Sequence, residues 1–285
     1  MHGALDVTDP QTDHHHEALL AAAMALSGRR LAILTGAGIS TDSGIPDYRG
    51  EGTRQRSRRP VRFAEYVASE HARKRYWARA YVGWPRLRDA APNPGHVLVG
   101  DLVKNSRAVG CITQNVDGLH QRGGADPVVE LHGALRLVRC LSCERIVDRD
   151  ALQAELSARN PDWSADAGRD KDAPDGDVDL DDGDIDRFVV VDCVCGGSLK
   201  PAVVFFGENV APPVVGEAWA LLARASGLLV LGTSLEVFSG RRFVLEANKR
   251  GLPIVLINRG PTRADDIVTV KIDGGVAPSL AALFG

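Results

Sequence analysis

Five short apolar segments, each of strand length, constrain the fold of this chain more than any other feature. They cover residues 30–35, 109–113, 128–131, 228–232 and 253–258, and residues 202–206 form a further extended segment. Nearly continuous apolar runs favour strands that are buried on both faces. Helical patterns separate them at residues 17–28, 62–82, 96–105, 215–225, 240–250 and 278–283. The alternation predicts an α/β fold in which helices cover both faces of a parallel sheet.

The formal net charge of −3 conceals an uneven distribution along the 285 residues. Residues 162–186 hold eleven aspartates and only two bases, so this insert carries −9 and the rest of the chain carries +6. The insert has little apolar surface to bury and is expected to be a loop. The basic stretch at residues 54–62 reads as a solvated loop, so nucleic-acid binding is not expected.

Several classes of protein are excluded at this stage. No apolar run approaches the ~20 residues that a membrane-spanning helix needs. The first twenty residues resemble neither a secretory signal nor an arginine-rich transit peptide. We therefore expect a cytoplasmic protein without membrane contact, and we favour a monomer.

A glycine loop follows the first strand directly. Gly36, Ala37 and Gly38 lead into Ser40, and such a loop lets backbone amides approach a pyrophosphate. The loop lacks the full dinucleotide fingerprint, so a tight strand-to-helix turn is the alternative. A long polar loop then continues over residues 41–50, which is typical of an active-site lid or of a surface turn.

Polar and glycine residues follow the ends of other strands. They are Gln114, Asn115, Val116 and Asp117; His132; Gly232, Thr233 and Ser234; and Asn258, Arg259 and Gly260. Ligands of open α/β sheets bind at the carboxyl ends of the strands. Amides and carboxylates there suit ribose hydroxyls, and a histidine there suits a general base. Helix capping and a structural histidine are the alternatives.

Four of the five cysteines form two close pairs, Cys140 with Cys143 and Cys193 with Cys195. Two such knuckles suit one tetrahedral zinc ion held by four thiolates. No further ligand position is evident, so we expect a structural ion rather than a catalytic one. The fifth, Cys111, lies in an apolar segment and is expected to be a buried thiol.

Together, these motifs resemble those of the sirtuins, the NAD-dependent protein lysine deacylases. The matching stretches are GAGISTDSGIPDYRG, TQNVDGLH, ELHG, CLSC, CGGSLKPAVVFFGE, LGTSLEV and INRGPTRADD. The resemblance implies a Rossmann-like domain with an inserted zinc-ribbon and helical domain. We expect the Rossmann-like part at residues 17–50, 90–135 and 200–285, a helical insertion at 51–89, and the zinc module with its acidic insert at 136–199.

The resemblance also implies the site residues. The NAD contacts would be Gly36, Ala37, Gly38, Ser40, Ile45, Asp47, Tyr48, Arg49, Gln114, Asn115, Val116, Asp117, Gly232, Thr233, Ser234, Asn258, Arg259, Gly260 and Val276. The catalytic residues would be His132, Asn115 and Asp117. The acyl-lysine oxygen would attack C1′ of the nicotinamide ribose, nicotinamide would leave, and His132 would remove a proton from a ribose hydroxyl.

An acyl-lysine peptide is the implied protein partner, and it would add as a strand between two edges. The edge residues would be Val204, Phe205, Phe206, Gly207 and Glu208 on one side, and Ser234, Glu236, Val237 and Phe238 on the other. Tyr76 and Arg79 share a helix face and resemble the pair with which desuccinylating sirtuins hold an acyl carboxylate. A solvated helix face is the alternative reading of this pair.

Two other functions use the same motifs. A protein mono-ADP-ribosyltransferase would need the same NAD site as a deacylase. A non-enzymatic sensor that binds zinc and NAD is a third hypothesis, and His132 with Asn115 argues against it.

Overall fold

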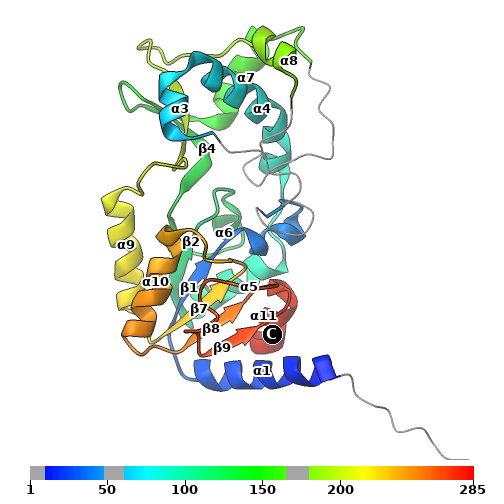
Figure 1. The fold of residues 1–285 in the computed structure, drawn as a ribbon, viewed down its shortest axis with the longest axis vertical. Helices are drawn as coiled ribbons and strands as arrows, with labels where there is room; N and C mark the ends of the chain where they lie inside the picture. The colour runs from blue at the N-terminus through cyan, green and yellow to red at the C-terminus, as the bar shows by residue number, and fades with distance from the viewer. Residues whose placement is uncertain (1–9, 48–60, 165–179) are drawn as a thin grey trace, which may run out of the picture.

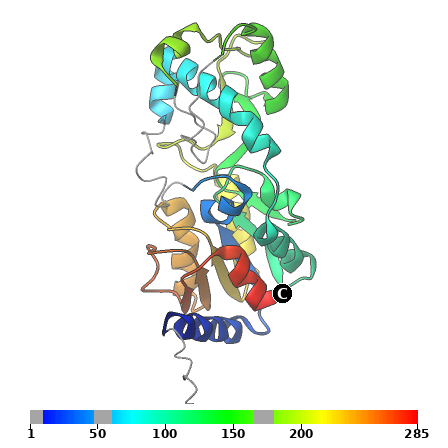
Figure 2. The same cartoon turned by 90° about the vertical axis from the view of Figure 1, so that its right-hand side faces the viewer.

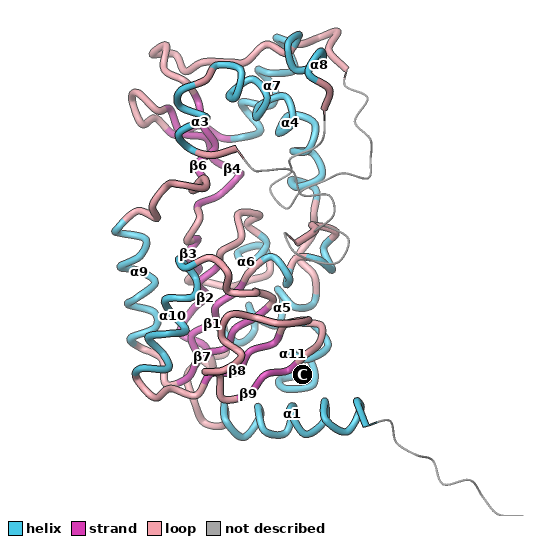
Figure 3. The backbone as a smooth tube through the Cα atoms, viewed as in Figure 1, coloured by secondary structure: helices cyan, strands magenta, loops and turns pink. Residues whose placement is uncertain are grey.

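The computed structural model describes residues 10–47, 61–164 and 180–285, with side chains from residue 14 onward. Its strands form two sheets of different size, one at each end of the molecule (Figures 1 and 3). Every predicted apolar segment from residue 30 to residue 258 overlaps a strand of one of these two sheets.

The larger sheet has six strands in the order β3-β2-β1-β7-β8-β9, and all neighbours are parallel. The strands are β1 (Leu31–Thr35), β2 (Ala108–Thr113), β3 (Val128–Glu130), β7 (Gly227–Leu231), β8 (Ile254–Ile257) and β9 (Val270–Ile272). This is the Rossmann-like strand order, in which the direction of progression reverses between β1 and β7. The predicted fold class is confirmed.

Helices cover both faces of this sheet, as the alternation of buried strand residues requires. On one face Ile33 and Leu229 pack with α1 (Pro10–Leu26), α5 (Pro94–Lys104) and α11 (Val276–Phe284). On the other face Leu34 and Val230 pack with α9 (Pro212–Ala223) and α10 (Phe238–Lys249). Figure 2 shows α10 and α11 on opposite sides of the strands.

The smaller sheet is antiparallel, with the order β5-β4-β6. Its strands are β4 (Gly133–Cys140), β5 (Ile146–Asp148) and β6 (Leu199–Val203). Around it lie α3 (Phe63–Ala68), α4 (Glu70–Asp89), α7 (Arg149–Arg159) and α8 (Asp182–Arg187), which share a second apolar core. Short helices η1 (Ala37–Ile39), η2 (Thr41–Ser43) and α6 (Leu119–Arg122) follow the strands of the larger sheet.

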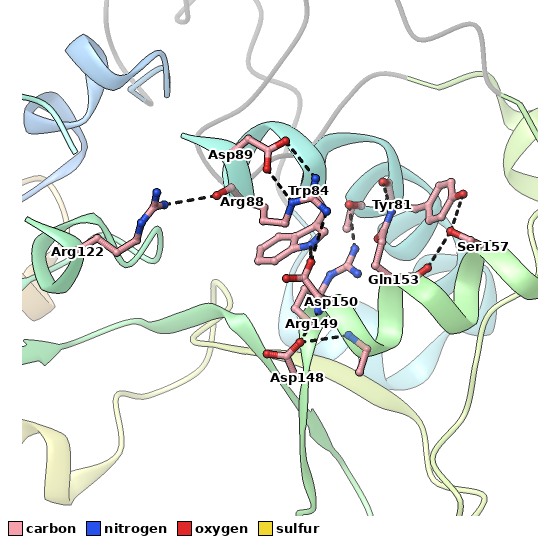
Figure 4. Close-up of polar contacts among 12 residues, drawn as sticks. Tyr81, Trp84, Arg88, Asp89, Arg122, Asp148, Arg149, Asp150, Gln153 and Ser157 are labelled. Carbon is pink, nitrogen blue, oxygen red and sulfur yellow. Dashed lines mark hydrogen bonds and ion pairs between the residues drawn. The ribbon is translucent and has the colours of Figure 1, made fainter. Parts of the chain in front are cut away.

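Polar contacts join the end of α4 to both halves of the molecule (Figure 4). The Trp84 indole N–H donates to Asp150 at the start of α7, with Nε1 and Oδ1 2.6 Å apart. The Arg149 guanidinium lies over the rings of Trp77 and Trp84, 5.4 and 5.1 Å from their centroids. On the other side, Arg122 of α6 donates to the Ala90 carbonyl at 2.6 Å. The α4 end therefore positions one half relative to the other.

Three expectations about elements need correction. Residues 62–82 are two helices, because Ser69 has extended backbone and its hydroxyl caps α4 by accepting from Ala72 N–H. The extended segment at 202–206 overlaps β6, which ends earlier, at Val203. Strands β4, β5 and β9 were not expected. Among the described residues, no helix combines the length and apolarity needed to cross a bilayer.

Candidate active site at the carboxyl ends of the parallel strands

The glycine loop lies directly against the end of β7. A Cβ on Gly36 would be 2.6 Å from the Thr233 Cβ, and a Cβ on Gly38 would be 2.9 Å from the Gly232 Cα. The Gly38 N–H donates to the Gly232 carbonyl at 2.8 Å. Side chains at these positions would collide with Thr233 and with the Gly232 backbone, so the absence of Cβ atoms lets the two strand ends meet at the switch point of the sheet.

Ser40, Asn115 and Asp117 form a buried hydrogen-bonded group beside this loop. The Ser40 hydroxyl donates to Asp117 Oδ2 at 2.7 Å and accepts from the Asn115 amide at 3.0 Å. Burial raises the pKa of Asp117, and hydrogen bonds from Leu119 N–H and Ser40 oppose the rise. The structure thus brings together three predicted site residues from the ends of β1 and β2.

Two buried histidines that sequence reasoning did not single out support this group. The backbone N–H of Asn93 points at His96 Nδ1 at 3.3 Å, so Nδ1 accepts and Nε2 carries the proton toward the Ser40 hydroxyl, also at 3.3 Å. His120 packs edge-on against His96 and bonds Thr35 at 2.9 Å. Burial lowers the pKa of His96 to about 4 and that of His120 to about 3. Both imidazoles are therefore neutral near pH 7.

His132 lies half-buried where the chain passes from the larger sheet to the smaller one. Its Nδ1 is 2.9 Å from the Gln114 carbonyl, and its Nε2 is 2.7 Å from the Ser239 hydroxyl. Burial is the largest influence and lowers the pKa of His132, the Gln114 bond raises it, and the charge of Arg242 lowers it. A neutral imidazole with an available nitrogen is the form that a general base needs.

Gln114 links this histidine to the glycine loop. Its side-chain amide donates to the Thr35 carbonyl at 3.2 Å and to the Thr233 hydroxyl at 3.0 Å. The predicted residues of the two halves of the site therefore meet at one side chain, between β1, β2 and β7.

The remaining predicted NAD residues lie along the same edge of the sheet. Asn258, Arg259 and Gly260 follow β8, with the Gly260 N–H 3.1 Å from Asp273, and Val276 opens α11. Ile45 is buried against the end of α4. Ala37 lies in η1, and Ser234 follows Thr233. Val116 lies three residues after the end of β2 and packs, partly buried, against the same core as Ile45. Tyr48 and Arg49 lie outside the described residues.

The first predicted peptide edge is bonded within the chain. The Val204 N–H donates to the His132 carbonyl at 2.8 Å, and the Phe205 N–H donates to the Glu208 carboxylate at 2.6 Å. Lys200, 5% exposed, pairs with Glu208 at 2.8 Å and lies 4.4 Å from the Phe205 ring centroid. Gly207 has a positive φ of 91°, and Phe206 is 48% exposed. The segment is therefore a turn that follows β6 and is held by hydrogen bonds and an ion pair within the chain.

The second predicted edge follows β7. The Ser234 carbonyl accepts from Arg263 N–H at 3.0 Å, and Glu236 pairs with the Arg263 guanidinium at 2.8 Å. Val237 is the residue before α10, and Phe238 is 58% exposed. His132 contacts both segments: its carbonyl accepts from the Val204 N–H, and its Nε2 bonds the hydroxyl of Ser239, just after Phe238.

Tyr76 and Arg79 are buried, at 8% and 6% exposure, so the reading of a solvated helix face is wrong. The Tyr76 ring lies 5.3 Å from that of Phe205 and 5.6 Å from that of Tyr66. Tyr76 thus belongs to the core behind the first predicted peptide edge, and Arg79 is buried one turn further along α4.

The four paired cysteines converge. Their sulfur atoms all lie within 4.8 Å of one another, with Cys140 and Cys195 3.5 Å apart and Cys143 and Cys193 3.7 Å apart. Four sulfurs about 2.3 Å from one tetrahedral zinc ion would be roughly 3.8 Å apart, so the set fits zinc. The Cys143 and Ser142 N–H groups point at Cys140 Sγ and lower the pKa of that thiol to about 6.

The fold and these clusters define a class: a Rossmann-like dinucleotide-binding protein with an inserted module that carries four zinc-ligand cysteines. A family model described as "Sir2 family" matches residues 36–239. The chain belongs to the Sir2, or sirtuin, family, and the resemblance seen in its motifs is confirmed.

Relatives and solved structures agree with this assignment. An NAD-dependent protein deacetylase of Xanthomonas axonopodis pv. citri is 49% identical over 257 residues, which is 90% of this chain and 87% of the relative. The human NAD-dependent protein lipoamidase sirtuin-4, mitochondrial, is 46% identical over 250 residues, covering 86% and 79%. A Sir2 structure with a p53 peptide and NAD+ is 32% identical, with a TM-score of 0.71 and coverage of 90% and 93%.

Proposed function

We propose that the chain is an NAD-dependent protein lysine deacylase that cleaves acyl-lysine to lysine, nicotinamide and O-acyl-ADP-ribose. The observation that carries the proposal is His132, a neutral imidazole whose Nδ1 is held by the Gln114 backbone carbonyl and whose Nε2 accepts from the Ser239 hydroxyl. The side chain of the same Gln114 bonds Thr233 beside the glycine loop. The names of the relatives, deacetylases and a lipoamidase, favour deacylation over protein ADP-ribosylation.

In this mechanism NAD is a co-substrate that supplies the ribose on which the chemistry takes place. His132 removes the proton from a ribose hydroxyl, because Nε2 is its basic nitrogen. Asn115 and Asp117 hold the nicotinamide-ribose end with Ser40, and Asn115 orients water. The close approach of Gly36, Gly38 and Gly232 gathers backbone groups where the phosphates would lie, while Asn258 and Val276 would contact the adenosine end. The four cysteines hold a structural zinc ion that takes no part in these steps.

The acyl-lysine peptide would lie between the two predicted edges and present its carbonyl to the ribose. A peptide that adds as a strand must find free backbone groups. Because Val204 and Phe205 N–H already have partners, we infer that the peptide pairs with the remaining backbone groups of these segments.

We further propose that Tyr76 and Arg79 favour acidic acyl groups. The Tyr76 ring packs against Phe205, and Arg79, three residues along α4, is buried. A guanidinium there meets few competing waters, and a carboxylate would pair with it. Arg79→Ala should lower the rate with succinyl- or hydroxymethylglutaryl-lysine peptides more than the rate with acetyl-lysine. An unchanged order of acyl preference would contradict this assignment.

Two further expectations belong to the same proposal. The protein would act as a cytoplasmic monomer on protein substrates, without nucleic acid. The Rossmann-like part would comprise residues 17–50, 90–135 and 200–285, interrupted by the 51–89 and 136–199 insertions. Size-exclusion chromatography with light scattering tests the first expectation, and limited proteolysis tests the second.

Mass spectrometry of an acylated target protein after incubation with NAD tests the function. Deacylation removes the mass of the acyl group, whereas ADP-ribosylation adds the mass of ADP-ribose. We expect acyl loss with the wild type and none with His132→Ala. A target that gains ADP-ribose and keeps its acyl group would refute the proposal in favour of the transferase.

A further inference from the structure

The hydrogen-bond partners of His132 define its tautomer. Nδ1 lies 2.9 Å from the Gln114 carbonyl, and a carbonyl can only accept, so Nδ1 carries the proton. Nε2 therefore presents its lone pair. The Ser239 hydroxyl, 2.7 Å from Nε2, must donate its hydrogen to this lone pair. The nitrogen that would accept the ribose proton is thus held by a serine of α10.

The backbone of α10 explains why Ser239 reaches His132. The helix begins at Phe238, so Ser239 lies in its first turn. The next residue, Gly240, packs directly on Gln114: a Cβ there would be 2.4 Å from Gln114 Oε1. The backbone carbonyl of Gln114 holds the opposite nitrogen of the imidazole. Two neighbouring residues of α10 therefore contact the histidine and the residue that orients it.

From this geometry we propose that Ser239 is a positioning residue for the general base, a role that rests on the proposed deacylase function. Its hydroxyl holds the His132 ring in one orientation by donating to the Nε2 lone pair, until the ribose hydroxyl takes its place. Ser239 itself exchanges no proton with the substrate.

The surroundings of His132 are consistent with this role. Burial lowers the pKa of His132, and the charge of Arg242, one turn along α10, lowers it further. The positive end of the helix dipole also disfavours an imidazolium at this position. Because these surroundings already keep the imidazole neutral, the role left to Ser239 is to fix the orientation of the ring.

Two reactions separate positioning of the base from general damage to the site. Exchange of labelled nicotinamide into NAD, in the presence of acyl-peptide, reports the bond cleavage that precedes the His132 step. Formation of deacylated peptide reports the whole reaction. We expect Ser239→Ala to keep exchange within roughly twofold of wild type and to lower deacylation by about tenfold. Ser239→Thr, which retains a hydroxyl, should restore most of the wild-type ratio of deacylation rate to exchange rate.

Nitrogen NMR of histidine-labelled protein supplies a readout that is independent of activity. His132→Ala identifies the signal among the eight histidines. In Ser239→Ala the Nε2 signal should move toward that of an unbonded lone pair, and Ser239→Thr should return it. The matched control is Ser157→Ala on α7, whose hydroxyl contacts Tyr81 at 3.1 Å; it should change neither readout.

The outcomes separate this role from the proposed function. Equal losses of exchange and deacylation in Ser239→Ala, or wild-type deacylation, would overturn the positioning role, as would an unchanged Nε2 signal. A wild-type protein that neither exchanges nicotinamide nor deacylates any acyl-peptide would refute the deacylase function instead. In that case the Nε2 signal alone still decides whether Ser239 holds His132.

Discussion

The buried ion pair of Lys200 and Glu208 provides a direct test of how the peptide-binding segment is held. The Lys200 ammonium lies 2.8 Å from Glu208 Oε2, with side-chain exposures of 7% and 20%. Glu208 Oε2 also accepts the Phe205 N–H at 2.6 Å, so the pair closes the turn after β6. Burial lowers the pKa of Lys200, and the Glu208 carboxylate opposes the shift.

The perturbation is Lys200→Met, which keeps an unbranched side chain, shorter by one heavy atom, and removes its charge. Breaking a fully buried pair costs about 3–5 kcal/mol, whereas an exposed pair contributes about 0–1 kcal/mol. Because Glu208 keeps a fifth of its side chain in water, we expect a loss of about 2 kcal/mol. At about 2–4 °C per kcal/mol, the Tm should fall by roughly 4–8 °C.

The assay combines denaturant unfolding with steady-state kinetics on an acetyl-lysine peptide. The loosened turn should raise the KM for peptide by about tenfold while kcat stays within about threefold. Lys249→Met is the matched control, since that ammonium is 81% exposed and 4.0 Å from Glu246. It should change the free energy of unfolding by less than about 0.5 kcal/mol. A Lys200→Met protein as stable as the control, with unchanged KM, would refute the reasoning.

Other parts of the molecule give three further predictions. In the unfolded chain histidine takes up a proton below about pH 6.5, whereas folded His96 stays neutral down to about pH 4. The free energy of unfolding therefore falls as the pH drops from about 6.5 to about 4. Denaturant titrations of His96→Gln should show a shallower fall over this range. An unchanged slope would contradict the neutral imidazole. Gly38→Ala should raise the KM for NAD by more than about tenfold, because its Cβ would meet Gly232 backbone, whereas Gly216→Ala, with open space, should be neutral or stabilising. Elemental analysis of the purified protein should find one zinc ion per chain. Cys193→Ser should lose the ion, while Cys111→Ser should retain it. Equal zinc contents in the two variants would exclude the four-cysteine site.

The sequence predicted the larger sheet well because its strands are buried on both faces. A strand without a polar face leaves a continuous apolar run, as in β1, β7 and β8, and the glycines and polar residues after it mark its end. β9 has three residues, of which only Ile272 is buried, so its run is too short to stand out. In the smaller sheet, β4 alternates buried and exposed residues and β5 has no buried residue.

The site residues that the sequence missed act through residues that it found. His96 lies in a helix start that reads as a capping box, with Asn93 as the cap, and nothing local indicates its contact with Ser40 56 positions earlier. Ser239 is a serine in the first turn of a helix, and its contact with His132 spans 107 positions. Such contacts depend on how the elements pack, whereas motifs report only neighbours along the chain.

The burial of Tyr76 and Arg79 likewise depends on packing that the local sequence does not show. A Y-x-x-R pair on a helix fits an exposed face as well as an interior one, because arginine is mostly found at surfaces. Only the packing of α4 against Phe205 and the smaller sheet decides between the two.

The stoichiometry of the reaction tests the deacylase function most directly. Wild-type protein, NAD and a panel of acyl-lysine peptides would be incubated, and nicotinamide, deacylated peptide and O-acyl-ADP-ribose would be quantified together. We predict equal amounts of all three with at least one acyl group, and none of them with His132→Ala. Nicotinamide release without deacylated peptide, or no release with any peptide, would contradict the assignment.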